Sequence, residues 1–266
     1  MYIGFLDSGI GGLTVLREAI KVLPEENFIY YADTLHAPYG IKSKEEVKKH
    51  VFNAVEFLAG KKIKMLVVAC NTATSIAINE IRAAYPFPVV GMEPAVKPAV
   101  EKNGTTKKRV LVVATPLTLK EEKFQNLVQR VDSMHLVDTL PMPELVEFAE
   151  KFIFHEDTII KYIKEKFSKI NFDNVGTLVL GCTHFPLFRE CFKKVIPSHV
   201  DIIDGGEGTV RRMVNILKTN TFEDNQNKIE KLTFITKKGG NISFYVSGKK
   251  LTDADTLKKY LGLIER

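Results

Sequence analysis

The chain has 266 residues, of which 45% are hydrophobic, and its net charge is +6. This length allows one large domain or two of ordinary size, and the composition excludes an intrinsically disordered chain. No apolar run reaches 18 residues, so the sequence predicts no transmembrane helix. The N-terminus enters a strand pattern at once and lacks a basic segment, so we expect no signal peptide and a cytoplasmic protein.

Basic residues are scattered in short groups with carboxylates nearby, as at 107–109 and 237–238. Neither a basic block nor an alternation of basic and aromatic residues occurs, so we expect no nucleic-acid or membrane partner. The three cysteines, Cys70, Cys182 and Cys191, are too few for a disulfide framework. None forms a Cys-x-x-Cys pair, and no histidine has the spacing of a zinc ligand, so the sequence indicates no metal site.

The first half of the chain alternates between apolar strands and amphipathic helices. Strands are predicted at residues 3–6, 28–32, 65–69 and 89–91, and helices at 13–23, 43–60 and 71–85. This alternation predicts an α/β fold with a mainly parallel sheet, in which ligands bind outside the carboxyl ends of the strands. Asp7, Asp33 and Cys70 all follow such ends. Ser43 and Glu46 form a capping box at the second helix.

The pattern begins again at Arg109. Strands are predicted at residues 110–114, 136–137, 178–180 and 200–203, and helices after a capping box of Thr118 and Glu121, at 143–152 and 157–167, from 185, and at 210–217. The tail predicts a surface loop at 219–228, strands at 232–235 and 242–246, and a helix at 252–261.

The repetition leads us to expect two similar lobes, each a mainly parallel sheet flanked by helices. Residues 1–97 together with 208–266 are expected to form lobe one, which carries Asp7 and Cys70. Residues 98–207 are expected to form lobe two, which carries Cys182 and His184.

Two segments share an apolar strand that ends in a cysteine and continues into hydrogen-bonding side chains. Residues 65–74 read Met-Leu-Val-Val-Ala-Cys-Asn-Thr-Ala-Thr, and residues 177–186 read Thr-Leu-Val-Leu-Gly-Cys-Thr-His-Phe-Pro. Each cysteine lies at a predicted strand-to-helix junction, where a helix N-terminus lowers the pKa of a thiol. Two matched thiols, one in each lobe, suit racemisation, in which a base removes an α-proton and an acid returns one on the opposite face.

The first strand ends in Asp-Ser-Gly-Ile-Gly-Gly at residues 7–12, a glycine-rich turn that leads into a helix. Such a turn presents backbone N–H groups and a helix dipole to an anion. The spacing matches neither the dinucleotide fingerprint nor a P-loop, so it does not indicate a nucleotide. Asp7 either acts as a base, holds an ammonium group, or serves only as a helix cap.

Four motifs together resemble glutamate racemase, of the aspartate/glutamate racemase superfamily. They are the 7–12 turn, Asp33 with Pro38-Tyr39-Gly40, Cys70-Asn71-Thr72-Ala73, and Gly181-Cys182-Thr183-His184. The resemblance extends from the first strand to about Asp204. It implies a cofactor-independent homodimer that interconverts L- and D-glutamate for peptidoglycan synthesis, with the active site in the cleft between two α/β lobes.

The resemblance also implies a role for each matching residue. Cys70 would exchange the proton on the D-glutamate face and Cys182 on the L-glutamate face, with Asp7 and His184 assisting them. Substrate binding would involve Asp7, Ser8, Tyr39, Gly40, Asn71, Thr72, Thr183 and His184, with Thr115 and Thr118 as weaker candidates. No metal would take part.

The sequence departs from the family pattern at two places and leaves several assignments open. Residues 140–147 lack the Cys-Pro pair that precedes an auxiliary glutamate in many members, so the role of Glu147 is open. Asp204 precedes Gly205-Gly206, where a serine or threonine is expected. Asp33 either assists catalysis or caps a turn, and Cys191 is expected to be structural. The remaining histidines, expected to be surface or core residues, are His36, His50, His135, His155 and His199.

Three other functions remain open on the sequence. The chain could be a racemase of aspartate or another small amino acid. It could be a hydrolase or decarboxylase in which one thiol works alone. It could also be a non-catalytic amino-acid-binding protein on the same scaffold.

Overall fold

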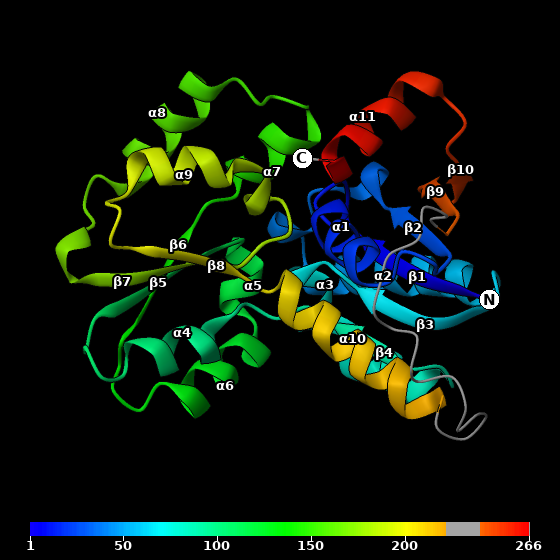
Figure 1. The fold of residues 1–266 in the computed structure, drawn as a ribbon, viewed down its shortest axis with the longest axis horizontal. Helices are drawn as coiled ribbons and strands as arrows, with labels where there is room; N and C mark the ends of the chain where they lie inside the picture. The colour runs from blue at the N-terminus through cyan, green and yellow to red at the C-terminus, as the bar shows by residue number, and fades with distance from the viewer. Residues whose placement is uncertain (222–239, 266) are drawn as a thin grey trace.

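Two mainly parallel sheets lie side by side in the computed structural model, which describes residues 1–221 and 240–265 (Figure 1). The first sheet has the order β10-β9-β2-β1-β3-β4 and the second β6-β5-β7-β8. The strands of the first sheet are β1 (Tyr2–Asp7), β2 (Phe28–Ala32), β3 (Ile63–Val68), β4 (Val89–Gly91), β9 (Ile242–Val246) and β10 (Lys249–Lys250). Those of the second are β5 (Arg109–Ala114), β6 (Val137–Pro141), β7 (Val175–Leu180) and β8 (Asp201–Asp204). Among these described strands, only the short β10 pairs antiparallel, with β9.

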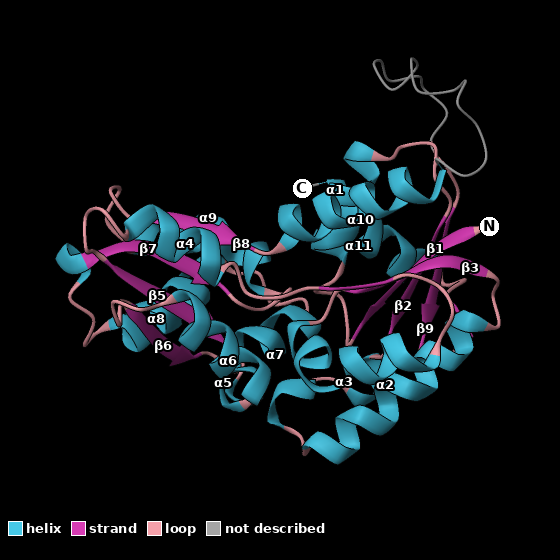
Figure 2. Cartoon of the chain, turned by 90° about the horizontal axis from the view of Figure 1, so that it is seen from below, coloured by secondary structure: helices cyan, strands magenta, loops and turns pink. Residues whose placement is uncertain are grey.

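Helices cover both faces of each sheet (Figures 1 and 2). Around the first sheet lie α1 (Leu13–Val22), α2 (Lys44–Ala59), α3 (Asn71–Ala84), α10 (Gly206–Thr221) and α11 (Ala254–Glu265). Around the second lie α4 (Val96–Asn103), α5 (Pro116–Lys120), α6 (Glu122–Val131), α7 (Glu144–Glu150), α8 (Glu156–Phe167) and α9 (Arg189–Val195). Short 3₁₀ turns are η1 (Thr34–His36), η2 (Tyr39–Ile41), η3 (Phe172–Asn174) and η4 (Phe185–Phe188). The two-lobed α/β fold predicted from the sequence is confirmed.

The apolar strands are buried because both of their faces pack on helices. On β1, Ile3 and Phe5 belong to the core beneath α1, whereas Leu6 belongs to the core beneath α2 and α3. All three are fully buried. The predicted stripe of α2, with Val47 and Val51 among its members, is also buried in the second of these cores.

Helix caps agree with the sequence in one case and differ in another. Ser43 accepts a hydrogen bond from the Glu46 N–H at 3.2 Å, so the predicted N-cap of α2 is confirmed, while the Glu46 carboxylate pairs with Lys42 at 2.6 Å. The cap predicted at Thr118 and Glu121 is wrong. Thr115 caps α5 instead and accepts from the Thr118 N–H at 3.3 Å, because Pro116 starts the helix one turn earlier.

The chain returns to the first sheet near its end. Strand β9 pairs parallel with β2, with Ile242 opposite Phe28, and α10 packs on α1. The lobe boundaries at 97/98 and 207/208 stay predictions. The loop predicted at 219–228 begins inside α10, and its remainder, like the strand predicted at 232–235, lies outside the described residues. Within the described parts of the chain, no helix is long and apolar enough to cross a bilayer.

Candidate active site

Both predicted thiols lie where a buried parallel strand ends. Strand β3 ends at Val68, and Cys70 is the N-cap residue of α3, with its Sγ accepting from the Ala73 N–H at 3.5 Å. Strand β7 ends at Leu180, and Cys182 precedes the η4 turn. Cys70 is 5% exposed and Cys182 6%, so both thiols are shielded from bulk water. Their strands belong to different sheets, one in each lobe.

The surroundings of Cys70 raise the pKa of its thiol to about 12. Burial is the largest cause, followed by the negative charge of Asp7, and the Ala73 N–H opposes both. The sequence predicted the opposite direction, because a helix N-terminus favours a thiolate in water. In this buried position the loss of solvation outweighs the N–H group. The charge of Cys182 also raises the pKa of Cys70, as a smaller cause.

Asp7 links the two lobes beside the thiols. Its carboxylate is fully buried and accepts hydrogen bonds from the Gly9 N–H at 2.9 Å and the Thr183 hydroxyl at 3.0 Å. Burial raises the pKa of Asp7, and the nearby His184 only partly offsets this. Helix α1 has Gly12 as its N-cap residue, so the interpretation of Asp7 as only a helix cap is wrong.

His184 connects Cys182 to a carboxylate that sequence reasoning missed. His184 Nδ1 lies 3.7 Å from Cys182 Sγ, and its Nε2 lies 2.6 Å from Glu150 Oε1. Burial alone lowers the pKa of His184, but hydrogen bonds to Cys182 and Glu150 raise it well above its usual value. Glu150 also accepts from the Ile10 N–H at 2.8 Å, so it fixes the imidazole against the first lobe.

Glu147, which the sequence left as a candidate, lines the same pocket as Glu150 but has no hydrogen bond to a predicted site residue in the described part of the chain. Its carboxylate is exposed and pairs with Lys151 at 3.3 Å. The helical spacing of α7 could have predicted from the sequence which of the two glutamates lies on its buried face. Glu150 follows the buried Val146 by four residues and therefore lies on the same face of α7, whereas Glu147 forms an i,i+4 pair with a surface lysine.

Ser8 and Asn71 offer hydrogen-bonding groups next to Cys70. The Cys70 thiol lies 3.8 Å from Ser8 Oγ. The Asn71 amide donates to the Met92 carbonyl at 3.3 Å, which fixes the orientation of the amide. Asn71 Oδ1 is a buried side-chain acceptor without a partner among the described residues. Because buried polar atoms are normally paired, this oxygen indicates a ligand that carries a hydrogen-bond donor.

Three threonine hydroxyls meet where α3 of the first lobe contacts α5 of the second. Thr72 Oγ1 lies 3.0 Å from both Thr115 Oγ1 and Thr118 Oγ1, which lie 2.9 Å from each other. All three side chains are buried. The two weaker candidates are therefore in direct contact with Thr72, and each hydroxyl can rotate to donate to an anion.

The loop after β2, which carries Tyr39 and Gly40, approaches the three threonines from the first lobe. Tyr39 donates its hydroxyl to Asp33 Oδ2 at 2.6 Å, so Asp33 does more than cap a turn. A Cβ atom on Gly40 would lie 2.3 Å from Thr115 Cβ, so a side chain at this position would push the lobes apart. The structure thus brings Tyr39 and Gly40 to the same inter-lobe seam as the threonines.

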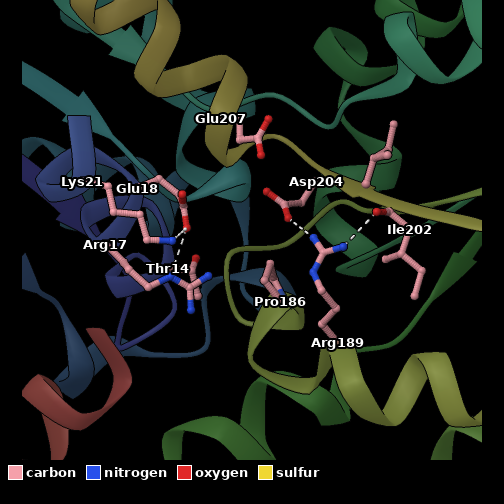
Figure 3. A pocket seen from close by; sticks show the side chains of 10 residues that line it. Thr14, Arg17, Glu18, Lys21, Pro186, Arg189, Ile202, Asp204 and Glu207 are labelled. Carbon is pink, nitrogen blue, oxygen red and sulfur yellow. Dashed lines mark hydrogen bonds and ion pairs between the residues drawn. The ribbon is translucent and has the colours of Figure 1, made fainter. Parts of the chain in front are cut away.

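A pocket of about 520 Å³ has Glu150 in its lining but neither thiol. It lies between the loop at 34–38 and α7, and Ile10, Glu150 and Tyr260 line it. Glu150 therefore stands between this pocket and His184, which is 2% exposed. A second pocket, of about 330 Å³, lies between α1 and β8 (Figure 3). None of its lining residues is a predicted site residue, and Arg189 pairs there with Asp204.

Comparisons with known proteins agree with this geometry. The family model described as Asp/Glu/Hydantoin racemase matches residues 13–213. The glutamate racemase of Halothermothrix orenii is 54% identical over 265 residues, covering 100% of this chain and 99% of that protein. Glutamate racemase 2 of Bacillus subtilis is also 54% identical, covering 100% and 96%.

Solved structures give the same result. The glutamate racemase of Campylobacter jejuni superimposes with a TM-score of 0.79 at 29% identity, covering 100% of this chain and 98% of that one. The Francisella tularensis enzyme in complex with D-glutamate has a TM-score of 0.78 at 27% identity, covering 100% and 94%. This chain therefore belongs to the Asp/Glu/hydantoin racemase family and, among these isomerases, to the glutamate racemases.

Proposed function

We propose that this protein interconverts L- and D-glutamate without a cofactor, by two-base proton transfer between Cys70 and Cys182. The main support is the pair of buried thiols at strand ends, one in each lobe. Asp7 lies near Cys70, and His184 lies beside Cys182. The names of its 54%-identical relatives and the D-glutamate bound to the Francisella tularensis enzyme support glutamate as the substrate. On the resemblance, we also propose a cytoplasmic homodimer that supplies D-glutamate for peptidoglycan.

The reaction from L-glutamate begins at Cys182. Its sulfur, as a thiolate, takes the α-proton, and the electron pair of the broken C–H bond stays on the α-carbon. Cys70 then gives its thiol proton to the opposite face, which forms D-glutamate and leaves a thiolate at Cys70. With a pKa of about 12, Cys70 carries this proton at neutral pH and suits the donor role in this direction. The reverse reaction starts at Cys70 and ends at Cys182.

The neighbours of each thiol assist a different half of the reaction. His184 lies beside Cys182, and its raised pKa keeps a positive charge where a thiolate must form. Glu150 holds this imidazole in place through Nε2. Asp7 lies on the Cys70 side, where its charge favours the protonated thiol. Asp7 therefore promotes proton uptake at Cys70 when D-glutamate is the substrate.

The substrate's own charges match the polar groups around the thiols. Its ammonium group needs acceptors, which the unpaired Asn71 Oδ1 and the Asp7 carboxylate supply. Its two carboxylates need donors. We assign these donors to the hydroxyls of Ser8 and Thr72 and to the backbone N–H groups of Tyr39, Gly40 and Thr183, with His184 closing the site on the Cys182 side.

Incubation of the enzyme with L-glutamate or L-aspartate in deuterated water, without pyridoxal phosphate, tests the proposal. Circular dichroism follows the loss of optical activity, and mass spectrometry follows deuterium at the α-carbon. We expect L-glutamate to lose its ellipticity and to gain one α-deuterium per inversion, with L-aspartate much slower. No change with glutamate would overturn the proposal. Faster reaction of aspartate would instead favour an aspartate racemase, and binding without deuterium uptake a non-catalytic protein.

A further inference from the structure

Three side chains that sequence spacing did not connect meet at the start of the loop after β2. His36 Nδ1 lies 2.9 and 3.0 Å from the two carboxylate oxygens of Asp33. The ring of His50, from α2, stacks on the ring of His36 with centroids 3.7 Å apart and planes 17° from parallel. One ligand atom from each of the three residues lies within 4.8 Å of the other two.

These distances suit a bound metal ion. An ion about 2.0–2.1 Å from a histidine nitrogen and about 2.0–2.2 Å from a carboxylate oxygen brings those two ligand atoms to roughly 3 Å from each other. The contact between His36 and Asp33 already has this separation. His50 has to turn its ring out of the stack on His36, because the lone pairs of two near-parallel rings lie in their ring planes and cannot both point at one ion.

The three side chains have the supports that metal ligands usually have. Tyr39 donates to Asp33 Oδ2 at 2.6 Å and fixes the carboxylate, and Glu46 lies 3.7 Å from His50 Nε2. Such outer contacts orient ligands and set histidine tautomers. The His36 side chain is 33% exposed, which leaves a route from solvent, while Asp33 is buried.

We propose that Asp33, His36 and His50 form a binding site for one divalent transition-metal ion, with zinc as the first candidate. Two imidazoles and a carboxylate favour zinc, cobalt, nickel or copper over magnesium or calcium, which prefer all-oxygen sites. A bound ion would tie α2 to the loop that carries Tyr39 and Gly40.

Isothermal titration of the full chain with zinc chloride tests this site, in parallel with thermal unfolding with and without zinc. We expect one equivalent to bind and to raise the melting temperature, because an ion that binds only the native state stabilises it. Removal of a ligand by His36→Gln or His50→Gln should weaken binding by at least about 10- to 100-fold. His155→Gln, which changes an exposed histidine on the far lobe, should bind zinc as the wild type does.

Cobalt distinguishes this site from the active-site thiols, which also bind soft metals. A site of nitrogen and oxygen ligands gives weak visible bands, whereas cysteine ligands add an intense near-ultraviolet band. His50→Phe keeps a stacked ring without nitrogen ligands, so it tests the site even if the glutamine variant unfolds. Zinc binding by the wild type that the His36 and His50 changes leave intact would overturn the proposal. So would an absence of binding, or a thiolate band that accounts for all the bound cobalt.

Discussion

Cys70 and Cys182 end equivalent parallel strands, yet their surroundings differ in charge. Cys70 faces the Asp7 carboxylate, and burial with this charge raises the pKa of its thiol to about 12. Cys182 instead has the imidazole of His184 at 3.7 Å, and Glu150 helps to raise the pKa of that imidazole. A common backbone position therefore does not make the two thiols alike. The charge of the neighbouring side chain differs between them: a carboxylate beside Cys70 and an imidazole beside Cys182.

In the proposed two-base mechanism, this difference gives the two sides of the site different tasks. The raised pKa of Cys70 suits proton donation, and the raised pKa of His184 favours a positive charge beside Cys182, where the mechanism needs a thiolate. Conversion of L- to D-glutamate would leave a thiolate at Cys70, and the reverse reaction would return its proton.

The largest expected effect comes from removal of either thiol. Cys70→Ser and Cys182→Ser should each lower kcat for racemisation by about 10³- to 10⁴-fold, because a hydroxyl is a far weaker acid–base group at neutral pH. Circular dichroism of both L- and D-glutamate measures this. Cys191→Ser is the control and should keep wild-type activity, since that cysteine lies on α9. Full activity in either active-site variant would exclude a two-thiol mechanism.

Asp7→Asn probes the Cys70 side. Loss of the carboxylate should lower kcat by about 10²-fold or more, with D-glutamate affected most. Because burial raises the pKa of Asp7, its ionised form destabilises the native state at neutral pH. The variant should therefore melt roughly 2–4 °C higher, the shift that about 1 kcal/mol produces in a domain near this size. Scanning calorimetry at neutral pH measures this shift, and a lower melting temperature would contradict the assigned cause.

Glu150→Gln probes the Cys182 side, with Glu147→Gln as its matched control on the same helix. The introduced amide can still accept a hydrogen bond from His184 but carries no charge, so kcat with L-glutamate should fall about tenfold. The control should change little, because Glu147 is exposed and pairs only with Lys151 among the described residues. Equal effects of the two changes on kcat would show that Glu150 does not assist Cys182 through His184.

The pH dependence of stability sharpens the role of Glu150. His184 has a folded-state pKa above its unfolded value, so it stabilises the protein below the unfolded pKa and loses this contribution as the pH rises through the folded pKa. Removal of the Glu150 charge lowers the folded pKa. In urea unfolding from pH 6 upward, Glu150→Gln should lose this stability at a lower pH than the wild type. An unchanged profile would show that Cys182 alone sets the pKa of His184.

The smallest effect is expected from Tyr39→Phe, which leaves both thiols untouched. The change removes the 2.6 Å hydrogen bond to Asp33 and loosens the loop that carries Gly40. A hydrogen bond to a charged group contributes about 1.5–3 kcal/mol, so KM for glutamate should rise about tenfold while kcat stays nearly constant. Steady-state kinetics separates the two. Tyr85→Phe, at the C-terminal end of α3, is the control.

The sequence predicted what depends on local pattern. Continuous apolar runs that end in polar side chains located the strand ends of Cys70 and Cys182, and the α2 stripe and cap followed from helical spacing. The contacts between lobes could not be predicted in this way. The bond from Thr183 to Asp7 and the pair of Glu150 with His184 depend on how the two sheets face each other.

The same limit explains the one wrong direction at a thiol. A helix N-terminus can be predicted from the sequence, but the burial of Cys70 near Asp7 is a property of the assembled lobes. His36 and His50 were likewise separate in the sequence and meet only because α2 packs beside the loop after β2. Charge and solvation at this site are therefore tertiary properties.

The account depends most on the two thiols acting on opposite faces of one carbon. Exchange of the α-hydrogen in deuterated water tests this directly. Mass spectrometry measures the exchange for each enantiomer of glutamate with each of the two serine variants. We expect Cys70→Ser to exchange only L-glutamate and Cys182→Ser only D-glutamate, both without inversion. Exchange of both enantiomers by one variant would show that a single thiol serves both faces and would contradict the two-base account.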